Sequence, residues 1–190
     1  MRKLIIVPIV HTPEDLGSYL PAARKQYVAR YGLKHWHQRL GMVEELWKGI
    51  QQRVLALPLD FSKTRLYQDG LPECGRELEI VEELAREGSR NHQLLLELVQ
   101  RGAMLMGTES LPLLMEERER LVKQRVTQKR RAEKEDGLYD ELIERRDEYI
   151  AQRIAATLQD GETGLLFIGA LHRVAGKLPK EIATCNLYTP

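Results

Sequence analysis

The chain has 190 residues and a mass of 22.0 kDa, the size of one ordinary domain with room for a hydrophobic core. Its 29 basic and 28 acidic residues leave a net charge of +1, so the overall charge does not indicate a nucleic-acid or anionic-membrane partner. The two cysteines, Cys74 and Cys185, are too few for a zinc-finger framework. We predict a single domain over residues 1–190.

No segment has the features of a signal peptide or of a membrane helix. The N-terminal apolar run is short and contains Pro8, and it lacks a small-residue cleavage site. No stretch approaches the ~20 apolar residues that a membrane-spanning helix needs. We therefore expect a cytoplasmic protein with no membrane partner.

Two apolar segments each lead directly into a histidine. Residues Leu4–Val10 precede His11, and residues Leu165–Leu171 precede His172. Continuous apolar runs rich in β-branched residues are typical of strands that are buried on both faces of a parallel or mixed sheet. Ligands gather at the carboxyl edge of such a sheet. We therefore predict that these strands lie side by side and that the two histidines share one site.

The segments between these two strands alternate between helical and strand patterns. In chain order we first predict a helical stretch from about Leu20 to Leu57 that is broken near Gly32, and then a strand over Thr64–Gln68. Two helices follow near Arg76–Glu87 and Asn91–Arg101, with Ser89 as an N-cap, and then a short strand over Ala103–Met106. The last predicted elements are long helices from Leu113 to Leu158 with a break at Asp136-Gly137, and a final strand over Ala183–Tyr188. This alternation predicts an α/β fold with a small, mixed or mostly parallel sheet flanked by long helices.

One predicted helix, over Glu116–Glu135, is heavily charged. Its most basic point, Lys129-Arg130-Arg131, has acidic residues on both sides, which favours a solvated helix with internal ion pairs over a nucleic-acid surface. The same helix could pack on a partner or form a homo-oligomer, so a regulatory or structural protein stays open as an alternative.

The C-terminal third resembles the end of the TraB/PrgY, GumN and Tiki family. The resemblance depends on the helix Glu144–Ile154 with its Arg146-Asp147 pair, and on the strand that ends in Gly169-Ala170-Leu171-His172 with Gly176 nearby. That family also opens with a strand ending in Gly-x-x-His, and Pro8-Ile9-Val10-His11 occupies that place here, with proline instead of the glycine. Erythromycin esterases and the haem-binding ChaN proteins are similar in architecture.

The resemblance implies roles for particular residues. By position, His11 and His172 match the motif histidines, and Arg146 matches the motif arginine with Asp147 as its partner. Asp69 is the nearest carboxylate at the end of the second strand, where the family usually has a glutamate.

These groups fit a metal-assisted hydrolase of a small ester, lactone or peptide. Two imidazoles and a carboxylate are a common ligand set for a divalent cation that activates a bound water. We predict His11, His172 and Asp69 as ligands of Mn, Co or Zn, with Glu14 or Glu73 as other carboxylates that could complete the set. Asp69 could also act as a general base.

Arg146 would bind a substrate carboxylate or stabilise an oxyanion. The same groups could act without a metal, with a histidine as the general base, as the resemblance to erythromycin esterases implies. The alternative is a non-catalytic carrier of a small ligand or, less favoured, of haem.

Further polar residues are candidates for substrate binding. Arg90 lies at the start of a predicted helix, where an anion would be favoured, although such residues usually cap the helix. Glu109 follows the third predicted strand and would face the same sheet edge if that strand is parallel. Glu14 lies in the loop after His11.

Helical periodicity makes a separate prediction about Arg146. It lies on the same stripe as Leu142, Tyr149 and Ile150, so it interrupts an apolar surface. A buried arginine needs partners, because an unpaired buried charge is costly. We predict that Arg146 is buried and hydrogen-bonded near the site, and that Arg145 is exposed.

Overall fold

The computed structural model of the chain describes residues 1–10, 20–126 and 132–188, and it gives the side chains of these residues outside 121–140. His11 and Glu14 therefore lie outside the described residues.

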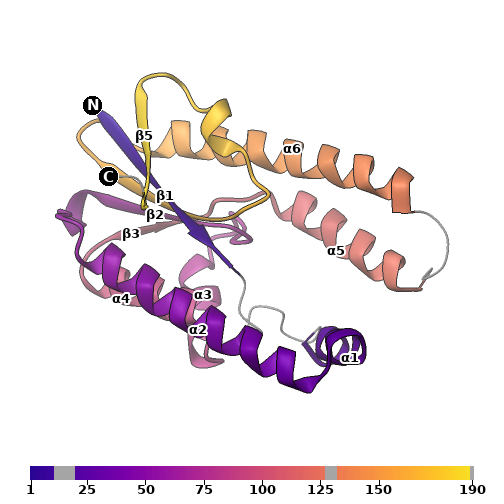
Figure 1. Cartoon of the computed structure of the whole chain (residues 1–190). Coiled ribbons are helices and arrows are strands. Elements are labelled where there is room, and N and C mark those ends of the chain that lie inside the picture. Colours follow the sequence, from indigo (N-terminus) through magenta and orange to yellow (C-terminus); the bar gives the residue numbers. More distant parts are fainter. Residues whose placement is uncertain (11–19, 127–131, 189–190) are drawn as a thin grey trace.

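A five-stranded parallel sheet forms the centre of the described fold (Figure 1). The strand order is β3-β2-β4-β1-β5, and every described strand pair is parallel. The strands are β1 (Arg2–Ile9), β2 (Thr64–Gln68), β3 (Met104–Met106), β4 (Thr163–Gly169) and β5 (Ile182–Asn186). The predicted α/β class is confirmed, and the sheet is parallel rather than mixed.

The two apolar segments that lead into histidines do form neighbouring strands. β1 pairs with β4 from Lys3 and Thr163 to Ile9 and Gly169, so their carboxyl ends are level. β4 is buried from Gly164 to Ile168, as expected for a strand covered on both faces. The adjacency of the strands was predicted correctly, while the position of the His11 side chain lies outside the described residues.

Helices cover both faces of the sheet (Figure 1). On one face, Leu66 and Phe167 pack against α2 (Leu33–Leu55), α3 (Glu77–Arg86) and α4 (Arg90–Gln100). On the other face, Tyr67 and Leu166 pack against α6 (Ala132–Thr157). Alternate residues of each strand thus enter different cores, because successive strand side chains point to opposite faces.

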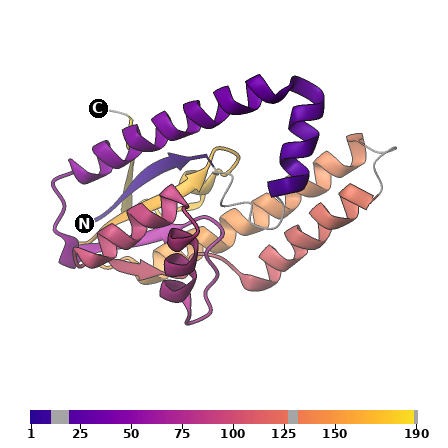
Figure 2. The ribbon, with the colours of Figure 1, turned by 90° about the horizontal axis from the view of Figure 1, so that it is seen from below.

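Two pairs of consecutive helices extend beyond the carboxyl ends of the strands (Figure 2). One consists of α1 (Leu20–Tyr31) and α2, which meet at Gly32 with a positive φ of 85°. The other consists of α5 (Leu111–Val126) and α6.

The predicted helix break at Asp136-Gly137 is wrong, because α6 runs through both residues. One glycine costs only about 1 kcal/mol relative to alanine, too little to end a long helix.

Two short 3₁₀ segments, η2 (Phe61–Lys63) and η3 (Val174–Lys177), complete the fold. Among the described residues, no helix has the length and apolar character required to cross a membrane.

Candidate functional site

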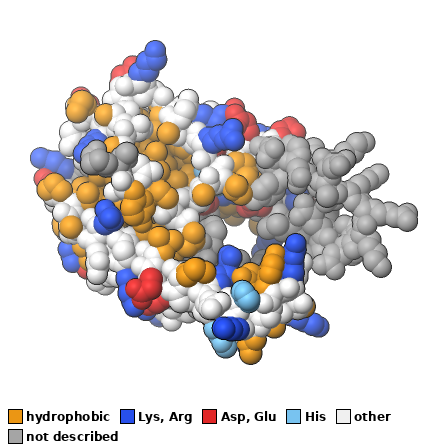
Figure 3. Space-filling model, in the orientation of Figure 1, with side chains coloured by type: hydrophobic (Ala, Val, Ile, Leu, Met, Phe, Trp, Pro, Cys, Tyr) orange, Lys and Arg blue, Asp and Glu red, His pale blue; other side chains and the backbone are white. Residues whose placement is uncertain are grey.

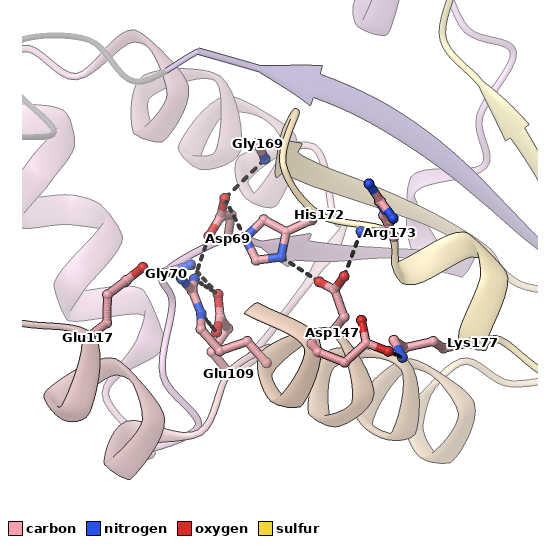
Figure 4. Close-up of polar contacts among 11 residues, drawn as sticks. Asp69, Gly70, Glu109, Glu117, Asp147, Gly169, His172, Arg173 and Lys177 are labelled. Atoms are coloured by element: carbon pink, nitrogen blue, oxygen red, sulfur yellow. Dashed lines mark hydrogen bonds and ion pairs between the residues drawn. The ribbon is translucent and has the colours of Figure 1, made fainter. Parts of the chain in front are cut away.

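Charged side chains from four elements meet at the carboxyl edge of the sheet (Figure 4). Asp69 follows β2, Glu109 follows β3 and His172 follows β4 by three residues. Arg146 and Asp147 lie on the buried stripe of α6, which crosses the same edge. The parallel sheet thus brings together residues that are up to 103 positions apart, which is the separation of Asp69 and His172 (172 − 69).

Arg146 is the centre of an ionic cluster. Its Nε donates to Glu109 Oε2 at 2.7 Å and its Nη2 donates to Glu109 Oε1 at 2.5 Å. Nη2 also donates to Asp69 Oδ1 at 2.9 Å, and Nη1 donates to Glu117 Oε1 at 2.8 Å. These four bonds occupy four of the five N–H groups of a guanidinium. Arg146 is therefore held by carboxylates of the protein itself.

The burial of Arg146 agrees with the helical stripe. Arg146 is 4% exposed, whereas Arg145 is exposed and pairs with Glu116 at 3.1 Å. The prediction that distinguished these two neighbours is confirmed.

Burial and charge oppose each other within the cluster. Burial alone would lower the pKa of Arg146, but its hydrogen bonds to Glu109 and the nearby carboxylates raise that pKa above its usual value. The guanidinium therefore stays charged. Burial raises the pKa of Glu109, although the bonds from Arg146 act in the opposite direction. The cluster is stable only while the arginine compensates the buried acids.

Backbone amides hold the two buried carboxylates in place. Gly169 N donates to Asp69 Oδ2 at 3.0 Å, and Gly70 N donates to Glu109 Oε1 at 2.9 Å. A Cβ at Gly169 would lie 3.1 Å from Asp69 Oδ2, closer than most real contacts. The first residue of the Gly-Ala-Leu-His segment is therefore a glycine at a point where Asp69 approaches the backbone closely.

The loops that carry Asp69 and Glu109 are joined to each other. The amides of Thr108 and Glu109 both donate to Leu71 O at 3.0 Å. A Cβ at Gly107 would lie 2.5 Å from Glu73 Cα, so only glycine allows the two backbones to approach this closely. The two carboxylates thus sit on a rigid double loop.

His172 lies between two carboxylates (Figure 4). Its Nδ1 contacts Asp147 Oδ1 at 2.5 Å, and Asp147 Oδ2 accepts from the Arg173 amide at 2.6 Å. A carboxylate can only accept, so the Nδ1 proton belongs to the imidazole and Nε2 carries the lone pair of the neutral ring. Nε2 lies 3.6 Å from Asp69 Oδ2.

The surroundings of His172 favour its protonated form. Burial lowers the pKa of the imidazole, but the hydrogen bond with Asp147 and the charge of Asp69 outweigh burial, and the pKa lies above the usual 6.5. The side chain is 5% exposed. The imidazole of His172 is thus buried and held in one orientation, and two carboxylates raise its pKa.

The described residues do not fit a divalent-metal site. Each oxygen of Asp69 and of Glu109 already accepts a hydrogen bond from Arg146 or from a backbone amide. Within the described residues, no group of three His, Cys, Asp or Glu side chains could hold a metal ion. The predicted set of His11, His172 and Asp69 includes a residue outside the described part, so metal binding stays a prediction.

Other predicted residues take different positions. Glu109 belongs to the cluster, as expected for a parallel third strand. Arg90 does not join it, because its guanidinium pairs with Glu44 of α2 at 2.5 Å. Glu73 contacts Arg153 at 2.9 Å and accepts from the Tyr149 hydroxyl at 2.8 Å, so it lies beside the cluster without bonding to Arg146.

Sequence patterns did not identify Glu117 as part of the cluster. It lies on α5 in a stretch that we interpreted as a solvated helix, yet its side chain is 18% exposed and pairs with Arg146. The predicted burial of Arg146 was the one available indication of such a residue, because a buried arginine needs more than one partner.

The chain belongs to the TraB/PrgY/gumN family, whose pattern matches residues 64–182. This range includes Asp69, Glu109, Arg146, Asp147 and His172, and it excludes β1, α1 and α2. The chain matches no curated protein and no solved structure.

Proposed function

We propose that this protein is a hydrolase of a small ester, lactone or peptide and that His172 is its general base. The observation that carries the proposal is the contact between His172 and Asp147 at 2.5 Å, which leaves Nε2 directed toward Asp69 at the carboxyl edge of the sheet. A buried carboxylate on one imidazole nitrogen fixes the tautomer and makes the other nitrogen the base.

The reaction follows from this arrangement. Nε2 of His172 takes a proton from a water molecule while the water oxygen attacks the substrate carbonyl carbon. The imidazolium then returns that proton to the leaving oxygen or nitrogen as the carbon–heteroatom bond breaks. Asp147 stabilises the imidazolium between the two steps.

Arg146 acts as a positioning residue in this proposal. Its hydrogen bonds to Asp69 and Glu109 fix the carboxylate that faces Nε2, and only one N–H remains for a substrate. This assignment replaces the role of direct substrate clamp that we expected from the sequence.

A panel of activated esters, lactones and fluorogenic peptides tests the proposal with the purified protein. We expect His172→Ala and Asp147→Asn to reduce kcat/KM by about 10²–10⁴-fold, the usual range for loss of general acid–base catalysis. Arg145→Gln is the matched control on the same helix and should retain full activity. Full activity in His172→Ala would remove His172 from the mechanism.

The pH profile separates a catalytic role from a structural one. The general base must be neutral, so activity should rise with pH through a midpoint above 6.5, because the pKa of His172 is raised. Activity that is highest on the acid side of this midpoint would contradict the role of base.

Metal dependence and ligand binding are tested in the same preparation. The metal-assisted version predicts loss of activity with a chelator and recovery with Mn²⁺, Co²⁺ or Zn²⁺. A thermal-shift increase with a small ligand or haem, without turnover of any substrate, would favour the non-catalytic carrier.

A further inference from the structure

A cavity lies in the helical layer on the other face of the sheet from the ionic cluster. It has a volume of about 580 Å³, within the range of small-molecule sites. Its lining comes from α1, α2, and the start of α4 with the preceding Gly88. Arg90 and Gln93, on α4, contribute polar groups, and Leu20, Leu40 and Val43 contribute apolar surface.

Both tryptophans of the chain line this cavity. Trp47 is 2% exposed and its Nε1 donates to Val10 O at 3.1 Å, which ties the cavity wall to the end of β1. Trp36 is 8% exposed and packs edge-on against Tyr27 at 5.6 Å. Rigid aromatic walls favour an apolar or aromatic ligand body.

The charges at the cavity favour an anion. Arg90 is neutralised by Glu44, which also lines the cavity. Arg24 also lines it, is exposed, and has no ion-pair partner among the residues that the structure describes. Among the described residues that line the cavity, two arginines face one glutamate, and the excess positive charge lies on Arg24.

The surrounding helical arm strengthens this preference. Residues 20–43 include no aspartate or glutamate, and they carry five cations: Arg24, Lys25, Arg30, Lys34 and Arg39. All five are exposed. Figure 3 shows blue and pale-blue side chains on this arm, without red ones. An excess of positive charge around a cavity attracts anionic ligands.

We propose that this cavity binds a small amphipathic anion, a carboxylate or phosphate on an apolar or aromatic body. The two tryptophans and the leucine side chains contact the body, and Arg24 pairs with the anionic group. The inference does not depend on the hydrolase proposal, because the cavity shares no residue with the ionic cluster.

Intrinsic fluorescence tests the proposal directly, since both tryptophans report on the cavity. The full chain is titrated with octanoate and with phenyl phosphate, and with octanol and phenol as neutral analogues. We expect a saturable change with at least one anion and weaker binding of its neutral analogue. The anion whose titration saturates shows whether the cavity prefers a carboxylate or a phosphate.

Charge variants locate the anion. Arg24→Gln should weaken binding roughly tenfold, as expected for loss of a charge-assisted hydrogen bond. Lys25→Gln is the matched control, because it removes the same charge from the next residue, which does not line the cavity. Glu44→Gln should tighten binding, because it frees Arg90. His172→Ala should bind as the wild type does.

Three results would overturn the proposal: no saturable change with either anion, equal binding of the neutral analogues, or equal loss of binding in Arg24→Gln and Lys25→Gln.

Leu40→Phe places a larger side chain in the wall of the cavity and should also reduce binding. Circular dichroism of each variant confirms that the variant is folded.

Discussion

The two sides of the sheet differ in how their polar groups are satisfied at the carboxyl edge. On the α6 side, the buried charges Asp69, Glu109 and Arg146 bond to one another. On the α2–α4 side, the buried oxygens Gln68 Oε1 and Asn91 Oδ1 have no hydrogen-bond partner among the described residues. Oppositely charged side chains can compensate each other in a dry interior, whereas no donor from the described residues faces the two amide oxygens.

This difference separates two kinds of site. The ionic cluster is rigid before any ligand arrives, which suits acid–base chemistry. The cavity on the other side has aromatic walls and an arginine, Arg24, without an ion-pair partner among the described residues, which suits binding.

Removal of Arg146 should have the largest effect on stability. Arg146→Met leaves Asp69 and Glu109 buried without compensation, and we expect a loss of about 3–5 kcal/mol in the free energy of unfolding. Arg145→Met, on the exposed face of the same helix, should change that free energy by no more than about 0.5 kcal/mol. Urea unfolding measures both. Equal effects would show that the cluster contributes no more than a surface pair.

His172 should make stability depend on pH. Its pKa is raised in the folded state, so its stabilising contribution is fully present below the unfolded value of 6.5 and is lost as the pH rises through the folded pKa. The stability difference between wild type and His172→Gln should therefore be larger at about pH 5.5 than at about pH 8.5. A difference that grows with pH would reverse the sign of the interaction with Asp147.

Asn91 should respond in the opposite way to Arg146. Asn91→Leu removes a buried oxygen that has no hydrogen-bond partner among the described residues, and it leaves no charge behind, so we expect a change between zero and about 1 kcal/mol of stabilisation. Urea unfolding at neutral pH measures it. A loss of stability as large as that of Arg146→Met would mean that the Asn91 oxygen has a partner, such as an ordered water.

Arg24 should have the smallest effect on stability. It is exposed and lies among like charges, so Arg24→Gln should leave the free energy of unfolding within about 0.5 kcal/mol of wild type. Thermal and urea unfolding check this. A large destabilisation would indicate that Arg24 supports the fold rather than a ligand.

The sequence determined much of the fold because hydrophobic periodicity is local. The apolar runs ending near His11 and His172 identified two neighbouring strands, and the stripe through Leu142, Arg146 and Ile150 identified a buried arginine. The Gly169–His172 segment indicated the family, and it also indicated that the site lies where this strand ends.

The pairing of the charges depends on tertiary packing. His172 contacts a carboxylate 25 residues earlier, Arg146 pairs with Glu117 29 residues earlier, and Arg90 pairs with Glu44 46 residues away. A sequence offers many acids for each base, and only the packing of helices on the parallel sheet selects among them. The cavity also depends on tertiary packing. Trp36 and Trp47 of α2 and Arg90 of α4 form one wall only because these two helices meet.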